Sequence, residues 1–187
     1  MSPHRLVPIV LVGMMVVVET YAGRLRRADA QARDRGSLYV LYALVALGYW
    51  AAFAMWGARR APGPRLGDWA LWTGAAVAVA GLALRLWSVI TLGQYFTYVV
   101  KVTPDQKVVD TGPYRLIRHP SYSGALLLGI GIGLTLGYAA TVLVIAATSL
   151  LAYAIRIRVE EQALAETIGE PYRAYMARTK RMVPFLW

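Results

Sequence analysis

Long apolar stretches separated by short polar ones extend along almost the whole chain. A helix that crosses a hydrocarbon core of about 30 Å needs roughly 20 largely apolar residues. Stretches near this length occur at residues 6–22, 37–57, 68–92, 121–136 and 139–157. None shows the alternation of apolar and polar residues that is typical of a half-buried strand. The pattern therefore predicts an all-α integral membrane protein with about five transmembrane helices.

The last two predicted helices are separated only by Gly137 and Tyr138, which predicts a tight helical hairpin. The first helix of this hairpin is short, which leaves open whether it crosses the membrane completely. Small residues recur on it at every fourth position, and this spacing lets a neighbouring backbone approach closely. These small residues are Ser121, Ala125, Gly129, Gly133 and Gly137. We expect the last predicted helix to pack against them.

The composition supports a membrane protein and narrows the chemistry. Hydrophobic residues make up 58% of the 187 residues, above the roughly 45–50% of soluble domains. The absence of cysteine excludes disulfides and thiolate metal sites, and two distant histidines, His4 and His119, argue against a metal centre.

The length suits one domain, residues 1–187. The first apolar stretch is long for a signal peptide and lacks a cleavage site, so we expect a retained span.

The net charge of +10 is divided unevenly between the two sides of the expected bundle. With five spans, the side of the C-terminus collects 15 Lys and Arg residues, and the opposite side has 4. Because basic loops favour the cytoplasm, we expect the N-terminus outside and the C-terminus inside. This arrangement also favours membrane orientation over nucleic-acid binding as the reason for the charge. The Ala/Arg/Gly-rich composition indicates a prokaryotic plasma membrane.

The longest stretch between predicted helices, residues 93–119, would lie on the cytoplasmic side. It contains many tyrosine and valine residues, which is unusual for a solvated linker. We therefore expect it to fold against the helices and to form the wall of a pocket.

This stretch runs into "RHPSYSG", where Pro120 suits the first turn of a helix and His119 its cap. The unsatisfied N–H groups of a helix start, with the hydroxyls of Ser121 and Ser123 beside them, suit a carboxylate or phosphate. The alternative is a well-capped helix start from which Arg118 reaches lipid headgroups.

A second group of charges follows the last apolar stretch. Arg156 and Glu160 are four positions apart, so they share one face of a helix that continues beyond the membrane. Charges at this depth usually face protein or a cavity, and a surface salt bridge is the simpler alternative. The following "IGEPYRAY" predicts a helix break and a second, amphipathic helix. Within the spans, Glu19 and Arg85 either pair with each other or reach headgroups.

The motifs "GPYRLIRHPSYSG", "RIRVEEQAL" and "IGEPYRAYMARTKRMVPF" together resemble the isoprenylcysteine carboxyl methyltransferase family, whose wider superfamily includes phospholipid N-methyltransferases. The resemblance covers about residues 93–185. It implies a membrane methyltransferase that uses S-adenosylmethionine without a Rossmann fold, and no strand followed by a Gly-rich turn occurs here. We accordingly divide the domain into three N-terminal spans, residues 1–92, and a catalytic region, residues 93–187.

The resemblance also implies site residues. Arg156, Glu160 and Arg118 would be catalytic, with Arg156 binding the acceptor. The cofactor would contact Lys101, Gln106, Lys107, Val108, Val109, Tyr114, His119, Pro120, Ser121, Tyr122 and Glu160.

The residue types agree with methyl transfer to a carboxylate. Such an acceptor is ionised at neutral pH and needs alignment rather than a general base, and Arg156 suits it. We therefore expect carboxyl O-methylation of a prenylcysteine-like or other lipophilic acid, which would enter from the bilayer. Alternatives are N- or S-methylation of a phospholipid amine or other lipophilic acceptor, and a non-catalytic lipid-binding protein. Besides membrane lipids, we expect neither nucleic acid nor metal as a partner.

Overall fold

The structure, a computed structural model, describes residues 2–24, 32–34, 36–59, 61–93, 100–101 and 108–183. Its helices are α1 (Pro3–Arg24), α2 (Gly36–Ala58), α3 (Trp69–Leu92), α4 (Pro120–Thr135), α5 (Ala139–Ile168) and α6 (Glu170–Arg178). A short 3-10 helix, η2 (Gly112–Arg115), precedes α4. Gly169 separates α5 from α6 with a φ of 74°, a left-handed conformation that glycine adopts without strain.

In the part of the chain that the structure describes, four helices, α1, α2, α3 and α5, are long and apolar enough to cross a membrane. The fifth apolar helix, α4, has 16 residues. At 1.5 Å per residue it extends about 24 Å, less than the roughly 30 Å of a hydrocarbon core. The predicted all-α membrane fold is therefore confirmed, as is the tight turn between α4 and α5.

A small two-stranded sheet was not expected. β1 (Ala32–Asp34) pairs in antiparallel fashion with β2 (Val100–Lys101), so the segments that follow α1 and α3 meet beyond the helices. Strands of two and three residues are too short for a recognisable alternation of apolar and polar positions, which is why the sequence pattern missed them.

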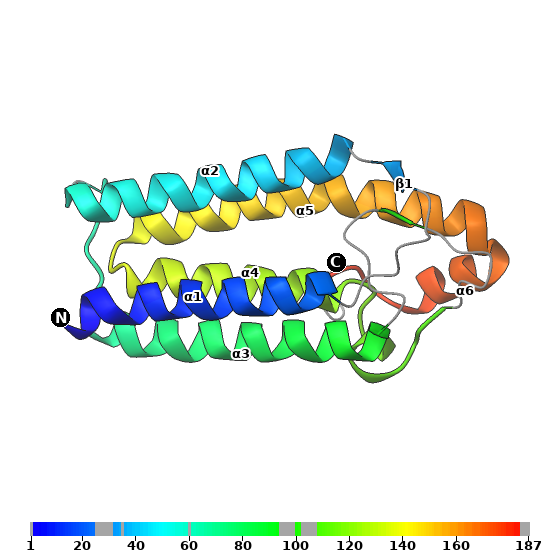
Figure 1. The fold of residues 1–187 in the computed structure, drawn as a ribbon, viewed down its shortest axis with the longest axis horizontal. Coiled ribbons are helices and arrows are strands. Elements are labelled where there is room, and N and C mark those ends of the chain that lie inside the picture. Colours follow the sequence, from blue (N-terminus) through cyan, green and yellow to red (C-terminus); the bar gives the residue numbers. More distant parts are fainter. Residues whose placement is uncertain are drawn as a thin grey trace.

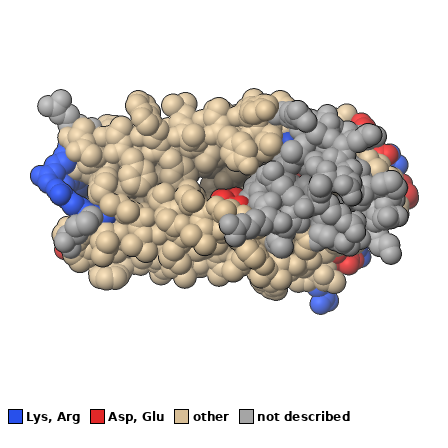
Figure 2. Space-filling view, viewed as in Figure 1, with Lys and Arg blue, Asp and Glu red and all other residues tan. Residues whose placement is uncertain are grey.

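The helices form two groups that are joined through α4 (Figure 1). In one group, α1 and α3 pack on α4 around Leu11, Leu82 and Leu128. In the other, α2 and α5 pack together around Leu41 and Ala152. Figure 2 shows a hollow in the flank of the bundle between these groups, with acidic atoms at its edge. The side of the bundle is therefore not closed by packed helices.

The expected packing of α4 on α5 is present. A Cβ atom added to Gly133 would lie 2.9 Å from the Cα of Val142 in α5, and one added to Gly129 would lie 2.9 Å from Ile145. Small residues on this face thus let the hairpin close tightly.

The opposite face of α4 packs even more closely on α3, which the sequence analysis did not anticipate. A Cβ atom on Gly124 would lie 2.6 Å from the backbone nitrogen of Arg85, and one on Gly131 would lie 2.6 Å from the carbonyl oxygen of Gly74. Gly124 and Gly131 are seven positions apart, so both fall on one helix face. This close contact between the two backbones fixes the start of α4 against α3.

Candidate active site

The start of α4 is the centre of a polar network at the α6 end of the bundle. Pro120 is the first residue of α4 and His119 its N-cap, as predicted. The chain after α6 runs beside this start. The backbone N–H of Arg118 donates to the carbonyl of Lys180 at 2.8 Å, and that of His119 to the carbonyl of Arg181 at 2.9 Å. The C-terminal segment thus fixes the position of α4.

The hydroxyls in the first turn of α4 already have protein partners. Ser121 Oγ accepts a hydrogen bond from Arg85 at 2.8 Å, and Ser123 Oγ donates to the carbonyl of Met182 at 2.6 Å. Arg85 also donates to both carboxylate oxygens of Glu19, at 2.5 and 2.7 Å. Of the two alternatives for Glu19 and Arg85, the structure shows the pairing, and it links α1, α3 and α4.

Glu161 collects three basic side chains. Its carboxylate lies 2.8 Å from Arg118 Nε, 2.9 Å from an Arg181 guanidinium nitrogen and 3.3 Å from His119 Nε2. The Glu161 side chain is 4% exposed, so these contacts replace the water that its charge would otherwise require. We infer that Glu161 holds the C-terminal segment against the start of α4.

Arg118, which the resemblance suggested as catalytic, faces the same segment. Besides Glu161, its guanidinium donates to the backbone carbonyls of Met176, at 3.0 Å, and Thr179. A guanidinium engaged in this way positions α6. Its contacts in the structure give it a positioning role.

Buried tyrosines outside the membrane helices complete the attachment of α6. The Tyr175 hydroxyl donates to the carbonyl of Tyr114 at 2.7 Å and so ties α6 to η2. Burial raises the pKa of Tyr114, Tyr172 and Tyr175 above the ordinary value of 10.0, and the Glu160 carboxylate adds to this effect for Tyr114 and Tyr172. These phenols therefore stay neutral and keep their donor hydrogens at neutral pH.

Arg156, Tyr122 and Glu160 form the part of the network that faces the bundle interior. Arg156 is 1% exposed, and its guanidinium donates to Ser37 of α2 and lies beside the Tyr122 phenol. The Tyr122 hydroxyl donates to Glu160 at 3.0 Å. The Tyr122 ring also packs on Tyr153, with ring centroids 5.1 Å apart. A buried cation and a carboxylate one helical turn apart are thus bridged by one phenol.

The neighbouring carboxylates of α5 serve different partners. Successive residues of a helix point about 100° apart. Glu160 consequently meets Tyr122 of α4, whereas Glu161 turns to Arg118 and Arg181. The "EE" doublet was visible in the sequence, but the partners of Glu161 come from segments far along the chain.

The structure brings part of the predicted set together. Tyr114, His119, Pro120, Ser121, Tyr122, Arg156 and Glu160 lie around the junction of η2, α4 and α5. Val108 and Val109 are half-buried just before η2. Lys101 lies in β2, its side chain outside the described part, and Gln106 and Lys107 lie outside the described residues. Ser37, Glu161 and Arg181 also belong to this network, although no sequence motif indicated their part in it.

Fold and site together define a multi-pass integral membrane protein with a polar site at one end of its helices. A family-wide sequence profile, "Isoprenylcysteine carboxyl methyltransferase (ICMT) family", matches residues 74–166. Through this region the chain belongs to that family.

Curated relatives agree with this assignment. "Protein-S-isoprenylcysteine O-methyltransferase B" of Arabidopsis thaliana is 32% identical over 127 residues, which make up 67% of this chain and 64% of the relative. The plant's "Protein-S-isoprenylcysteine O-methyltransferase A" is 31% identical over 127 residues, with the same shares of 67% and 64%. The chain thus spans 64% of the length of these relatives.

A solved structure has a similar fold. It is that of "the eukaryotic intramembrane Ras methyltransferase ICMT (isoprenylcysteine carboxyl methyltransferase) without a monobody". The TM-score is 0.64 at 27% sequence identity, and the match covers 77% of this chain and 52% of that one.

Proposed function

We propose that this protein is an integral membrane methyltransferase that uses S-adenosylmethionine to methylate the carboxylate of a prenylcysteine-like or other lipophilic acid. The observation that carries the proposal is the buried Arg156 on α5, one turn before Glu160 and joined to it through Tyr122 of α4. The names of the plant relatives support the same activity.

The residues present fit the methyl donor. When bound, S-adenosylmethionine supplies a methyl group on a positively charged sulfur. The Glu160 carboxylate suits the amino group of its methionine part, and Val108, Val109 and Tyr114 offer an apolar and aromatic wall for the adenine. His119, Pro120, Ser121 and the residues of the preceding loop, Lys101, Gln106 and Lys107, complete the proposed set.

Arg156 carries the selection of the acceptor. A guanidinium binds a carboxylate through two parallel hydrogen bonds, and its burial strengthens this attraction. A carboxylate is already ionised at neutral pH, so the chain needs only to align it and to exclude water. An amine acceptor would have to lose a proton first and, while charged, would be repelled by Arg156. The site therefore favours O-methylation.

The two reactants would enter by different routes. The hollow in the flank of the bundle offers a lipophilic acceptor a way in from the bilayer (Figure 2). The donor is water-soluble and would enter at the α6 end. The excess of basic residues at that end supports a cytoplasmic location for the site, with the N-terminus on the opposite side of the membrane.

Calorimetric titration with S-adenosylhomocysteine tests the donor assignment. We expect saturable binding to the purified protein, weakened about tenfold or more by Glu160→Gln, because one charge-assisted contact is lost. Glu166→Gln, an exposed carboxylate two turns further along α5, is the matched control and should bind like the unmodified chain. A folded sample that binds no S-adenosylhomocysteine in detergent or in nanodiscs would refute the proposal.

A further inference from the structure

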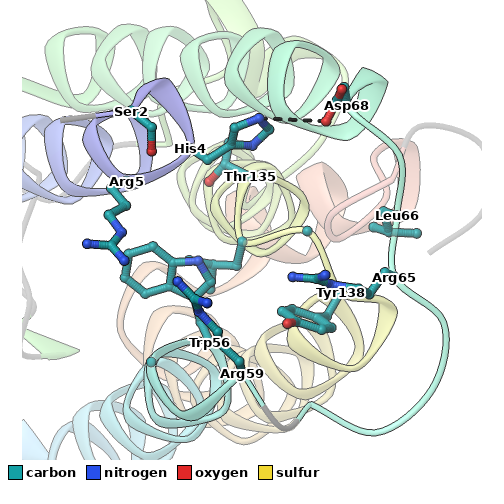
Figure 3. Close-up of a pocket in the computed structure, with 13 residues that line it drawn as sticks. Ser2, His4, Arg5, Trp56, Arg59, Arg65, Leu66, Asp68, Thr135 and Tyr138 are labelled. Carbon is teal, nitrogen blue, oxygen red and sulfur yellow. Dashed lines mark ion pairs between the residues drawn. The ribbon is translucent and has the colours of Figure 1, made fainter.

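A second pocket lies at the other end of the bundle, away from α6. It has a volume of about 690 Å³ and opens between the start of α1, the end of α2, the segment before α3 and the α4–α5 turn. Figure 3 shows Arg5, Arg59 and Arg65 reaching this space from three separate elements, with Trp56 and Tyr138 among them. Basic atoms also gather at this end of the molecule in Figure 2. The pocket is thus distinct from the Arg156–Glu160 site.

The charge of the pocket is positive. Among the described residues that line it, Asp68 is the only acidic one. Its carboxylate lies 3.6 Å from His4, and its side chain is 96% exposed, so it points largely to solvent. Arg65 is held 5.2 Å above the Tyr138 ring by a cation–π contact. The carboxylate of Asp68 therefore offsets only part of the charge of three guanidinium groups.

The helix ends add to this field. Three helices, α1, α3 and α5, begin beside the pocket, whereas two, α2 and α4, end there. Each helix start carries about half a positive charge and each helix end about half a negative charge, so the starts are in excess. The pocket is consequently suited to an anion.

The position of the pocket relative to the bilayer indicates which anion it binds. Trp56 and Tyr138 line it, and the neighbouring Trp69 and Trp72 of α3 are 59% and 65% exposed. Tryptophan and tyrosine concentrate where hydrocarbon meets the headgroups of a bilayer. We propose that this pocket binds the phosphate group of an anionic membrane lipid. Arg5 and Arg59 are two of its cations, and Arg65, which lies over the Tyr138 ring, is the third.

Native mass spectrometry of the whole chain released from nanodiscs tests the lipid assignment, with equal amounts of phosphatidylglycerol and phosphatidylcholine as the probe. The unmodified chain should retain phosphatidylglycerol selectively. The double substitution Arg5→Gln with Arg59→Gln should lower the amount of retained phosphatidylglycerol about tenfold, because two charge-assisted contacts are lost. The matched control, Arg158→Gln with Arg173→Gln, removes the same charge at the α6 end and should leave retention unchanged.

Three outcomes would count against the proposal. Equal retention of both lipids, or an equal loss in the control pair, would overturn it. Inorganic phosphate shares the chemistry, so it is titrated into lipid-free protein in detergent. Phosphate binding that depends on Arg5 and Arg59 without any lipid retention would overturn the lipid as the source. Thermal denaturation checks that both pairs of substitutions leave the fold intact, and none of these outcomes depends on methyl transfer.

Discussion

Glu161 and Arg118 lie 2.8 Å apart, from carboxylate oxygen to Nε, with side chains that are 4% and 8% exposed. This contact joins α5 to the segment before α4, and Arg181 brings the end of the described chain to the same carboxylate. The C-terminal segment, residues 179–183, is therefore held against the start of α4 by one carboxylate and two guanidinium groups. Glu160, the proposed contact to the methyl donor, is the immediate neighbour of Glu161 on α5.

Replacing Glu161 should loosen the attachment of the C-terminal segment to the start of α4. Glu161→Gln leaves Arg118 and Arg181 without their shared anion in a buried place, and breaking such a pair costs about 3–5 kcal/mol. We expect lower thermal stability and faster amide hydrogen exchange over residues 170–183. Glu166→Gln serves as the control. Unchanged exchange in this segment would show that Glu161 does not hold it.

The Glu19–Arg85 pair should be strongly coupled. Glu19→Gln or Arg85→Gln alone removes this ion pair but keeps the other charge, whereas the double substitution removes both charges. We expect a double-mutant cycle to give a coupling free energy of about 1 kcal/mol or more, measured by thermal denaturation in detergent. Strictly additive effects would mean that this contact does not join α1 to α3.

Close packing of α3 on α4 predicts a sharp response at Gly124. A methyl group there would meet the backbone nitrogen of Arg85 at 2.6 Å, so Gly124→Ala should destabilise the fold by about 1–3 kcal/mol. Gly13→Ala in α1, where nothing lies within 4 Å of the added atom, is the matched control and should be neutral or slightly stabilising. Equal melting temperatures for the two variants would contradict the packing.

Stability should fall in alkaline solution. Burial raises the pKa of Tyr114, Tyr172 and Tyr175, so the folded chain keeps these phenol protons at a pH where the unfolded chain loses them. Their contribution is complete below pH 10.0, the ordinary pKa of tyrosine, and declines as the pH rises above it. Melting temperatures measured from pH 7 to 11 test this. Tyr175→Phe should show a shallower alkaline decline, and an identical decline would count against the assignment.

The helices were predictable because their residues carry the signal locally. Apolar length marked the spans, and Pro120 and Gly137 marked the boundaries of α4. The shared helix face of Arg156 and Glu160 was also predictable, because residues four positions apart lie about one turn apart in any α-helix.

Long-range partners were not predictable in the same way. The i+4 spacing showed the α5-facing ridge of α4, but Gly124 and Gly131 form a second ridge whose partner, α3, is distant in sequence. Likewise, nothing near Glu161 in the sequence indicates that Arg181 returns to it. Only the packing of the helices brings these residues together.

The proposed reaction is methyl transfer to a carboxylate bound by Arg156. The most direct measurement supplies reconstituted protein with S-adenosylmethionine labelled in the methyl group and with a prenylcysteine analogue, and then treats the product with base. A carboxyl methyl ester releases its label as methanol, whereas N- and S-methyl products do not. We predict base-labile label that Arg156→Gln reduces about 100-fold or more, the loss of a buried charge-assisted pair. Base-stable label, or transfer unaffected by Arg156→Gln, would contradict the account.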